Sequence, residues 1–352
     1  MTTNNSILCD TADKLRVSGI NTIQIHPTLR CNLKCRHCYS FSSPMSKDSL
    51  TLENLKPFLK YAFQEGFTNL SFSGGEPMLF AELEETLQFS KSIGFRNAMV
   101  TNGMLFGSEK AKKIVKIFDL IAISIDGKPE LHDYIRGQKG AFQKMIEGIK
   151  ILKDSQIDFG FIHTISNQSW EDLIWLGDFA YQNGAKLLQL HPLENAGRTN
   201  IEFSEGFLND ITLHKIFIIT NYLKEKFNGI MEIQLDLSHH EFLKSFPESF
   251  GIFRSPFSQN THFSKMVNNI VINENGSILP ITYGISETFS LGNIKTFNPA
   301  KNLFDSYTKE KYNTFFQLYN NTYEKILKNK NKNLVNWGEL IITESHKFSP
   351  VI

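Results

Sequence analysis

The stretch Thr22-Ile-Gln-Ile-His-Pro27 is the first of six short apolar runs that decide the fold. Each run has the length of one β-strand and ends in polar or turn-forming residues. The other five are NLSFSG (69–74), NAMVTNG (97–103), LIAISIDG (120–127), FGFIHTIS (159–166) and LLQLHPLE (187–194). Amphipathic stretches separate the runs, and parallel strands require such helical crossovers. Six units are too few to close a full barrel, so we expect an α/β fold with a partial (β/α)6 parallel barrel.

Local signals mark the helices between the runs. Ser108 is a candidate N-cap, and Ser169 with Asp172 resembles a capping box ahead of the next helix. Pro57 falls inside the helical pattern of residues 52–63. Because proline cannot donate a helical hydrogen bond, we expect either a kink or a later start of that helix.

The alternation of strands and helices fades after residue 200. We therefore expect an N-terminal extension over residues 1–20, the barrel over 21–200, a C-terminal cap over 201–300 and a helical tail over 301–352. Within the cap, the segment MVNNIVINENGSILPI predicts a hairpin that turns at Asn275-Gly276. A further strand is expected at residues 231–237.

Composition excludes several classes of protein. Apolar residues make up 41% and charged residues 21% of the chain, a balance that excludes wholesale disorder. The formal charge of +1 offers no general attraction to nucleic acid or anionic lipid. The chain opens without a signal-peptide pattern and has no run of about 18 apolar residues, so we expect a cytoplasmic protein with no membrane span.

Three of the four cysteines lie within eight positions, in Cys31-Asn-Leu-Lys-Cys35-Arg-His-Cys38. A reducing cytoplasm preserves such thiols for metals or catalysis. Three thiolates from one loop can occupy three corners of a cubane iron-sulfur cluster and leave the fourth iron without a protein ligand. The alternative is structural zinc with His26 or His37 as the fourth ligand, although no second cysteine pair exists.

The spacing Cys-x3-Cys-x2-Cys after a first strand resembles the signature of the radical S-adenosylmethionine (SAM) superfamily. Gly74-Gly75-Glu76-Pro77, which ends the second run, is similar to the family's GGE motif. Glycine allows positive φ and close approach, so the resemblance implies that this strand end binds the ammonium of SAM. We expect Glu76 to orient the loop rather than to act as a base.

Further motifs resemble the peptide- and protein-modifying branch that often carries a C-terminal SPASM domain. In that branch the residues matching Ser124 and Asp126 lie by the ribose of SAM, and the match to Arg136 pairs with its carboxylate. The backbone at the His37 position reads adenine there. The resemblance thus implies that SAM is bound by His37, Tyr39, Gly74, Gly75, Glu76, Asn102, Ser124, Asp126, Arg136 and Leu190.

The C-terminal part resembles a SPASM segment only in its flanks, Asn275–Pro280 and Leu291–Ile294. Where that pattern expects cysteine, this sequence has Ile281, and Cys9 is the only cysteine outside the triplet. We therefore expect a degenerate, SPASM- or twitch-like α+β cap that covers the barrel mouth and binds no auxiliary cluster. Cys9 is expected to have no chemical role.

The resemblance also implies a mechanism. The open iron of one 4Fe-4S cluster would chelate SAM, and one electron from a flavodoxin- or ferredoxin-type donor would cleave it to methionine and a 5′-deoxyadenosyl radical that abstracts hydrogen. Substrate contacts are expected from the later strands, where alternation places Gln189 and His191 on one side of the sheet. Glu194 and Arg198 follow them, and His163 and Thr164 of the fifth run are expected to join them.

The leading hypothesis is a maturase that crosslinks, epimerises or oxidises a ribosomally made peptide. Only about 20 residues precede the first run, so such a peptide would dock on another surface or on a separate leader-peptide-binding protein. The second hypothesis is dehydrogenation, decarboxylation or rearrangement of a small molecule such as a sugar, nucleotide or cofactor precursor. The third is a non-catalytic zinc-binding protein.

Overall fold

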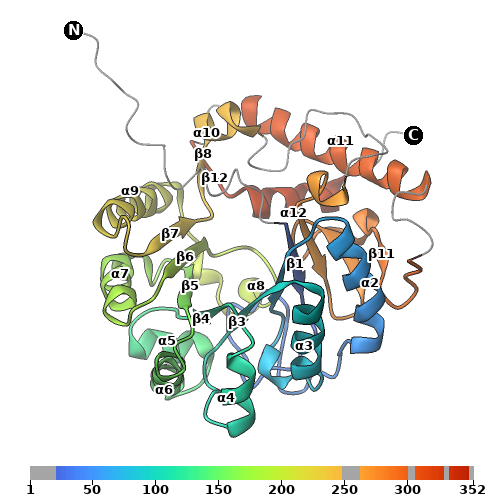
Figure 1. Cartoon of the computed structure of the whole chain (residues 1–352). Coiled ribbons are helices and arrows are strands. Elements are labelled where there is room, and N and C mark those ends of the chain that lie inside the picture. The colour runs from blue at the N-terminus through green and yellow to red at the C-terminus, as the bar shows by residue number, and fades with distance from the viewer. Residues whose placement is uncertain (1–20, 248–261, 300–305, 329–332, 349–352) are drawn as a thin grey trace.

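The computed structural model describes residues 21–247, 262–299, 306–328 and 333–348 (Figure 1). Cys9 and the expected N-terminal extension lie outside these residues. None of the described helices is long and apolar enough to cross a lipid bilayer.

The six predicted strands form, and each lies parallel to its neighbours in one sheet. They are β1 (Thr22–Ile25), β2 (Asn69–Phe72), β3 (Arg96–Thr101), β4 (Leu120–Ser124), β5 (Phe159–Ile165) and β6 (Leu187–Pro192). Helices cover the outer face of the curved sheet: α2 (Leu52–Gln64), α3 (Leu83–Ile93), α4 (Glu109–Val115), α5 (Pro129–Arg136), α6 (Ala141–Asp154) and α7 (Leu173–Gln182). The predicted parallel partial barrel is therefore confirmed.

The sheet extends beyond these six strands at both edges, in the order β11-β10-β9-β1-β2-β3-β4-β5-β6-β7. β7 (Glu232–Leu235) adds in parallel to β6, and β9 (Asn269–Ile272) adds in parallel to β1. β10 (Ser277–Pro280) and β11 (Gly292–Asn293) follow in antiparallel pairing, so the predicted hairpin forms. That hairpin continues the barrel sheet across the expected boundary at residue 200, because β1 would otherwise leave backbone hydrogen-bonding groups unpaired at an edge.

The remaining elements gather at the β7 edge and along one end of the barrel (Figure 1). β8 (Ser238–His239) pairs antiparallel with β12 (Leu334–Val335), which brings the start of α12 close to the barrel. The helices are α8 (Thr199–Glu202), α9 (Asp210–Lys226), α10 (His240–Ser245), α11 (Ser306–Lys328) and α12 (Trp337–Lys347). Short 3-10 helices occur at η1 (Pro77–Leu79), η2 (Trp170–Asp172), η3 (Ser204–Gly206), η5 (Phe263–Lys265) and η6 (Glu287–Phe289).

One local prediction is wrong, one is confirmed, and for a third one of its two alternatives is excluded. α2 begins at Leu52 and contains Pro57, so the later start does not occur. Ser169 forms no capping box, since its hydroxyl already accepts a hydrogen bond from the Ser166 N–H at 2.9 Å and lies 3.1 Å from Nε2 of His163. Ser108 does cap α4 by accepting a hydrogen bond from the Ala111 N–H.

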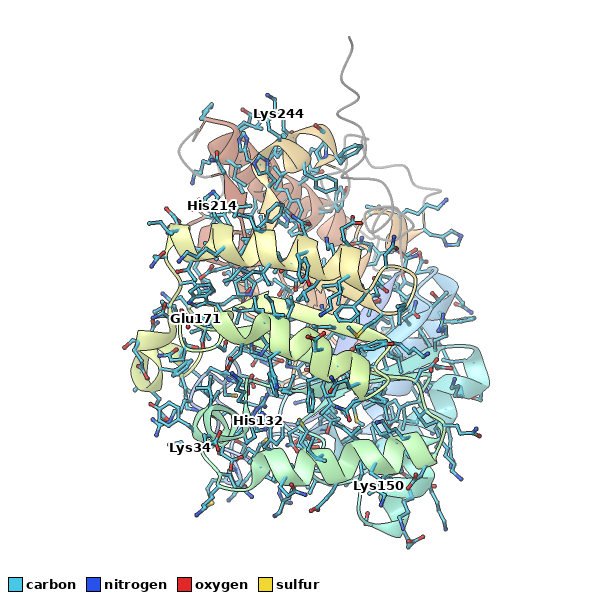
Figure 2. All side chains as sticks on the ribbon, turned by 90° about the vertical axis from the view of Figure 1, so that its left-hand side faces the viewer. Lys34, His132, Lys150, Glu171, His214 and Lys244 are labelled. Carbon is cyan, nitrogen blue, oxygen red and sulfur yellow. The ribbon has the colours of Figure 1, made fainter. Side chains whose placement is uncertain are left out.

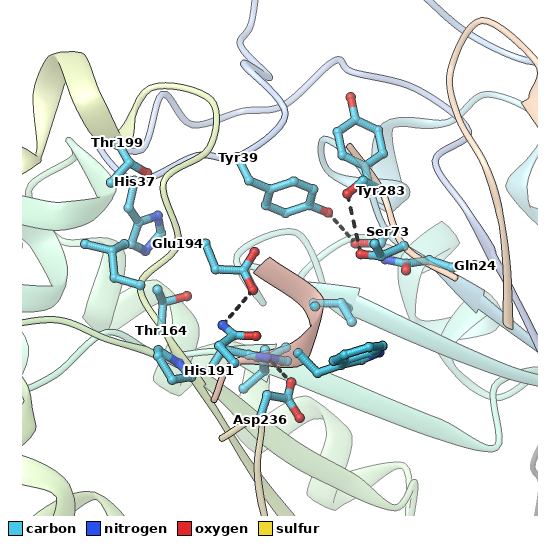
Figure 3. A pocket seen from close by; sticks show the side chains of 18 of the residues that line it. Gln24, His37, Tyr39, Ser73, Thr164, His191, Glu194, Thr199, Asp236 and Tyr283 are labelled. Carbon is cyan, nitrogen blue, oxygen red and sulfur yellow. Dashed lines mark hydrogen bonds and ion pairs between the residues drawn. The ribbon is translucent and has the colours of Figure 1, made fainter. Parts of the chain in front are cut away.

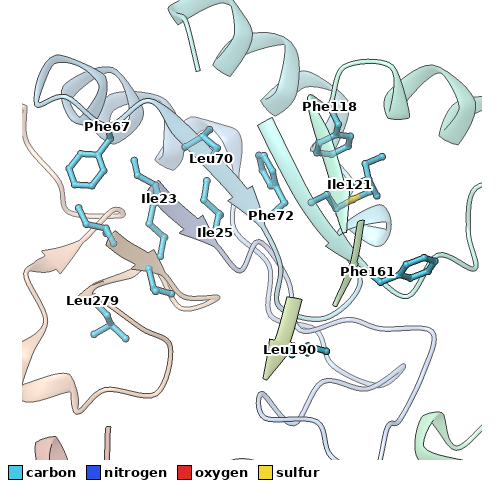
Figure 4. Packing of buried hydrophobic residues seen from close by; sticks show 14 of the residues in the cluster. Ile23, Ile25, Phe67, Leu70, Phe72, Phe118, Ile121, Phe161, Leu190 and Leu279 are labelled. Atoms are coloured by element: carbon cyan, nitrogen blue, oxygen red, sulfur yellow. The ribbon is translucent and has the colours of Figure 1, made fainter. Parts of the chain in front are cut away.

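Alternate residues of each strand face opposite sides, and this decides what lies in the core. Ile23, Leu70, Ile121 and Phe161 point outward and are fully buried beneath the helices (Figure 4). The helices in turn present polar side chains to solvent, as Figure 2 shows along α6, α7 and α9. The inward-facing strand residues are left to line the interior of the barrel.

Candidate active site

Cys31, Cys35 and Cys38 follow β1 and line one cavity of about 150 Å³ at the carboxyl ends of the strands. We call this space the cysteine cavity. Burial raises the pKa of Cys31 to about 12 and also raises the pKa of Cys35, which is 7% exposed. Because both thiols are neutral at pH 7, binding of a metal must displace their protons.

The thiols fit an iron-sulfur cluster better than a single zinc ion. Among the described residues, no three His, Cys, Asp or Glu side chains are close enough together to hold one metal ion. His26 is stacked on the Tyr283 ring at 4.3 Å and does not line the cysteine cavity. Nε2 of His37 lies 3.1 Å from Asp126, so this nitrogen already has a partner. Three thiols spread around a shared cavity suit the larger cubane.

Two glycines press the end of β2 against the cysteine loop. The Gly75 N–H donates to the Thr28 carbonyl at 2.8 Å, and the Glu76 N–H donates to the Arg30 carbonyl at 2.9 Å. A Cβ atom at Gly75 would lie 2.3 Å from the Arg30 oxygen, so a side chain cannot fit. The GGE segment therefore sets the shape of the loop that carries the cysteines.

The Glu76 carboxylate ties this segment to the end of β3. It accepts hydrogen bonds from the Thr101 hydroxyl at 2.8 Å, the Asn102 N–H at 3.0 Å and the Met78 N–H at 3.1 Å. Its exposed fraction is 1%, and burial raises its pKa. With its oxygens occupied by three donors, Glu76 is placed to orient the two strand ends.

A second support for the cysteine loop comes from the end of β6 and was not predicted. The Arg198 guanidinium donates to the carbonyls of Cys35 and Ser42, each at 2.9 Å, and its backbone N–H donates to the Cys38 carbonyl at 2.9 Å. Gly197 has φ of +56° and lies directly against Cys38. The prediction that Arg198 contacts substrate is therefore corrected, because its polar atoms hold the loop. The isolated glycine before it was the available signal.

Arg136 and Asp126 form a buried ion pair next to the cysteines. Arg136 Nε lies 2.5 Å from Asp126 Oδ2, and its Nη1 donates to the Cys35 sulfur at 3.7 Å. Burial alone would raise the pKa of Asp126, but the charges of Arg136 and His37 outweigh it and hold that pKa well below its usual range. Asp126 is fully buried and does not line the cavity, which corrects its expected place beside a ribose.

The structure brings most of the other predicted SAM contacts to the cysteine cavity. Its lining includes His37, Tyr39, Gly74, Gly75, Glu76, Asn102, Ser124 and Arg136. Asn102 also donates to Asn32 at 2.8 Å, which links β3 to the cysteine loop. Leu190 is the exception, because it faces the outer helices and is fully buried.

A larger cavity of about 440 Å³ adjoins the first and shares six lining residues with it, namely His37, Tyr39, Ser73, Val100, Ile162 and Thr164. We call it the mouth cavity (Figure 3). His191 and Glu194, which are predicted to contact substrate, line this cavity, and Gln189 pairs with Ile162 on the same inward face without reaching it.

His163 is wrongly predicted as a substrate contact. It pairs in register with Leu190 on the outward face of the sheet. Its ring contacts the Ile125 carbonyl at 2.7 Å and the Ser169 hydroxyl at 3.1 Å, and its exposed fraction is 1%. A buried histidine with both nitrogens occupied serves packing here.

The far wall of the mouth cavity comes from segments for which the sequence offered little signal. Asp236 follows β7 and forms an ion pair with His191, and Asn336 donates to Glu194 at 3.0 Å. Tyr283 enters after a tight turn at Ile281, a β-branched residue with φ of +69°. Trp337 completes the wall.

Comparison with known proteins identifies the domain that carries the cysteine cavity. The family model "Radical SAM superfamily" matches residues 25–180. Residues 25–180 are a radical SAM domain. The radical SAM domain therefore covers the cysteine loop, the GGE segment and strands β2 to β5, and it provides all of the described lining of the cysteine cavity except Arg198.

Relatives of known activity differ in their products. Fe-coproporphyrin III synthase of Methanosarcina barkeri is 32% identical over 173 residues, which cover 49% of this chain and 43% of that protein. The antilisterial bacteriocin subtilosin biosynthesis protein AlbA of Bacillus subtilis is 29% identical over 174 residues, covering 49% and 39%. The chain thus spans about half the length of these relatives or less.

Solved structures share the fold. The structure of anSMEcpe with bound AdoMet and the Cp18Cys peptide superposes with a TM-score of 0.64 at 20% identity, covering 91% of this chain and 87% of that one. The similarity extends over the C-terminal part as well as the radical SAM domain.

Proposed function

We propose that this chain is a radical SAM enzyme that modifies a ribosomally made peptide by crosslinking, epimerisation or oxidation. The observation that carries the proposal is that the cysteine cavity adjoins the mouth cavity, with six lining residues in common. A third space of about 470 Å³ shares Pro192, Leu193, Val335 and Asn336 with the mouth cavity. Three spaces in series suit an elongated substrate better than a compact one.

The residues that would hold the cofactors follow from the site. Cys31, Cys35 and Cys38 would bind one 4Fe-4S cluster, and the remaining walls of the cysteine cavity would enclose SAM. When bound, the reduced cluster and SAM supply the one-electron chemistry that removes a hydrogen atom from an unactivated C–H bond. A flavodoxin- or ferredoxin-type protein would provide the electron, and a separate leader-binding protein would deliver the peptide.

The chain's own residues supply position and shielding. Glu76 and Arg198 fix the cysteine loop from two sides, at β3 and at β6, with hydrogen bonds of 2.8 to 3.1 Å. Burial raises the pKa of Cys35, and the Arg136 guanidinium, whose Nη1 lies 3.7 Å from the Cys35 sulfur, partly offsets that rise and would favour the thiolate when a cluster binds. Tyr283 and Trp337 line the mouth cavity, where with a bound substrate they would help to exclude water.

Known proteins support a peptide substrate. AlbA is named for bacteriocin biosynthesis, and the anSMEcpe structure holds a peptide together with AdoMet. The similarity to Fe-coproporphyrin III synthase supports the second candidate, a small-molecule substrate.

The deciding experiment is anaerobic reconstitution with iron and sulfide, followed by incubation with SAM and dithionite. We expect iron and sulfide at about four equivalents each, as one cubane requires, and 5′-deoxyadenosine formation. Peptides encoded by adjacent reading frames should change mass when added. One equivalent of zinc without iron after anaerobic purification would overturn the proposal. If no peptide is modified and the enzyme instead converts a small molecule that is a substrate of enzymes encoded by adjacent genes, the second candidate function is supported.

A further inference from the structure

The two connected cavities differ in charge. The cysteine cavity has two arginines in its wall, Arg136 and Arg198. The mouth cavity has two carboxylates, Glu194 and Asp236, and no lysine or arginine among the described residues that line it. A substrate that enters the mouth cavity therefore meets a wall of negative polarity.

Glu194 contributes most of this polarity. Its carboxylate points toward the middle of the cavity, between His37 and Tyr39 (Figure 3). Asp236 forms an ion pair with His191, whereas no ion pair within the described chain includes Glu194. Burial raises the pKa of Glu194, while the hydrogen bond from Asn336 and the nearby His191 act in the opposite direction.

The structural role of Glu194, which is to accept a hydrogen bond from Asn336, does not require a negative charge. Its Oε1 accepts one hydrogen bond from the Asn336 amide, and Asn336 in turn caps α12 by accepting from the Glu339 N–H. A glutamine at position 194 would accept the same bond. Glu194 is partly buried, and no hydrogen bond to its Oε2 is found among the described residues, so this oxygen is available to a ligand in the mouth cavity.

Three aromatic side chains line the same space. The Tyr39 and Tyr283 rings meet edge to face with centroids 5.3 Å apart, and Trp337, the residue after Asn336, also lines the cavity. Aromatic faces attract cations and pack well against methylene groups. A carboxylate among aromatic rings is the combination that recognises an alkyl chain ending in a positive charge.

We propose, on the basis of the function proposed above, that the mouth cavity binds a primary ammonium or guanidinium group at the end of a flexible substrate side chain. Glu194 is the charge partner of that group. Tyr39, Tyr283 and Trp337 enclose its methylene stem.

The test measures binding of matched probes to the reconstituted protein with SAM, by isothermal titration under anaerobic conditions. The probes are acetyl-glycyl-lysyl-glycinamide, the same tripeptide with norleucine, and n-butylamine. We expect the lysine probe to bind about tenfold more tightly than the norleucine probe, as a charged hydrogen bond provides. Glu194→Gln should remove this preference and leave norleucine binding unchanged.

A matched control is Asp178→Asn, which removes a carboxylate paired with Lys226 on the outer helices. It should retain the full preference, and so should Glu194→Asp, which keeps the charge if Glu194→Gln fails to fold. Equal affinity of the lysine and norleucine probes, absence of binding by both, or a preference that survives Glu194→Gln overturns the inference.

Two further comparisons distinguish a peptide from a free amine as the source of the cation, and a failure of this inference from a failure of the proposed function. Tighter binding of the lysine tripeptide than of n-butylamine identifies a peptide, and the reverse identifies a free amine; both support a cationic substrate. If SAM is bound and 5′-deoxyadenosine forms while the lysine preference is absent, only this inference fails. If neither cluster nor SAM is bound, the proposed function fails first.

Discussion

The cysteine cavity and the mouth cavity are built in different ways. Backbone groups shape the first: Gly75, Gly197 and the carbonyls of Arg30 and Cys38 meet at distances that exclude side chains. Side chains shape the second. Those that it does not share with the cysteine cavity come mainly from β6, the β7 end and the C-terminal segments. The difference teaches that the part which would bind a constant cofactor tolerates little change, whereas the part which would select a substrate is open to substitution.

The largest expected effect concerns the cysteine cavity. Cys35→Ala removes one of the three proposed ligands, and we expect loss of the brown colour, of bound iron and of 5′-deoxyadenosine formation, with the protein still folded. Iron analysis, visible absorption and circular dichroism provide the measurements. Retention of both colour and deoxyadenosine would contradict the ligand assignment and the comparison built on it.

Next in size is the buried ion pair. Asp126→Asn removes the carboxylate that pairs with the buried Arg136 guanidinium and leaves its positive charge uncompensated. We therefore expect the free energy of unfolding to fall by about 3 kcal/mol. Urea denaturation measures this. Asp178→Asn, which breaks an exposed pair with Lys226, is the control and should change stability by about 0.5 kcal/mol or less. Similar losses for both variants would mean that the buried pair is not special.

Two glycine substitutions, at Gly75 and Gly107, test whether close backbone packing shapes the cysteine cavity. Gly75→Ala forces a Cβ atom to within 2.3 Å of the Arg30 oxygen, and we expect a loss of about 2 kcal/mol together with weaker retention of iron. Gly107→Ala meets no atom within 4 Å and is the matched control. Equal behaviour of the two variants in thermal unfolding would argue against a close-packed GGE segment.

His26 lies behind Tyr283 and should make this wall sensitive to acid. Burial lowers its pKa from 6.5 to about 3, so below pH 6.5 the unfolded chain binds a proton that the folded chain does not. Stability should therefore fall as the pH drops from 6.5 toward 3. At pH 4.5, two units below 6.5, we expect this contribution to be about 2.7 kcal/mol, and His26→Phe should abolish it. Parallel pH profiles of urea unfolding for wild type and variant would refute the assignment.

The smallest effect is expected in the mouth cavity. Asn336→Ala removes the N-cap of α12 and the donor to Glu194, and should lower the unfolding free energy by about 1 kcal/mol. Iron content and SAM binding should stay unchanged, because Asn336 does not line the cysteine cavity. A loss of iron in this variant would show that the two cavities are not independent.

Sequence reasoning succeeded where neighbouring residues decide the outcome. The strands β1 to β6, the cap at Ser108 and the joint cavity of Cys31 with the GGE segment follow from short-range patterning. It failed for His163, because strand alternation separates two faces but does not say which face turns inward. It also failed for Asp126, whose partner Arg136 lies ten positions away on a helix that the motif alone does not orient.

By itself, the sequence determined the parallel partial barrel and the position of its three cysteines, since two-residue periodicity, glycine conformations and ligand spacing act along the chain. Only the tertiary structure decided which side chains meet in the mouth cavity. Pairing of β9 with β1 and of β12 with β8 joins residues more than ninety positions apart, and these pairings bring Tyr283 and Trp337 to Glu194. Such long-range contacts depend on how whole sheet edges and apolar faces are covered, which no local pattern specifies.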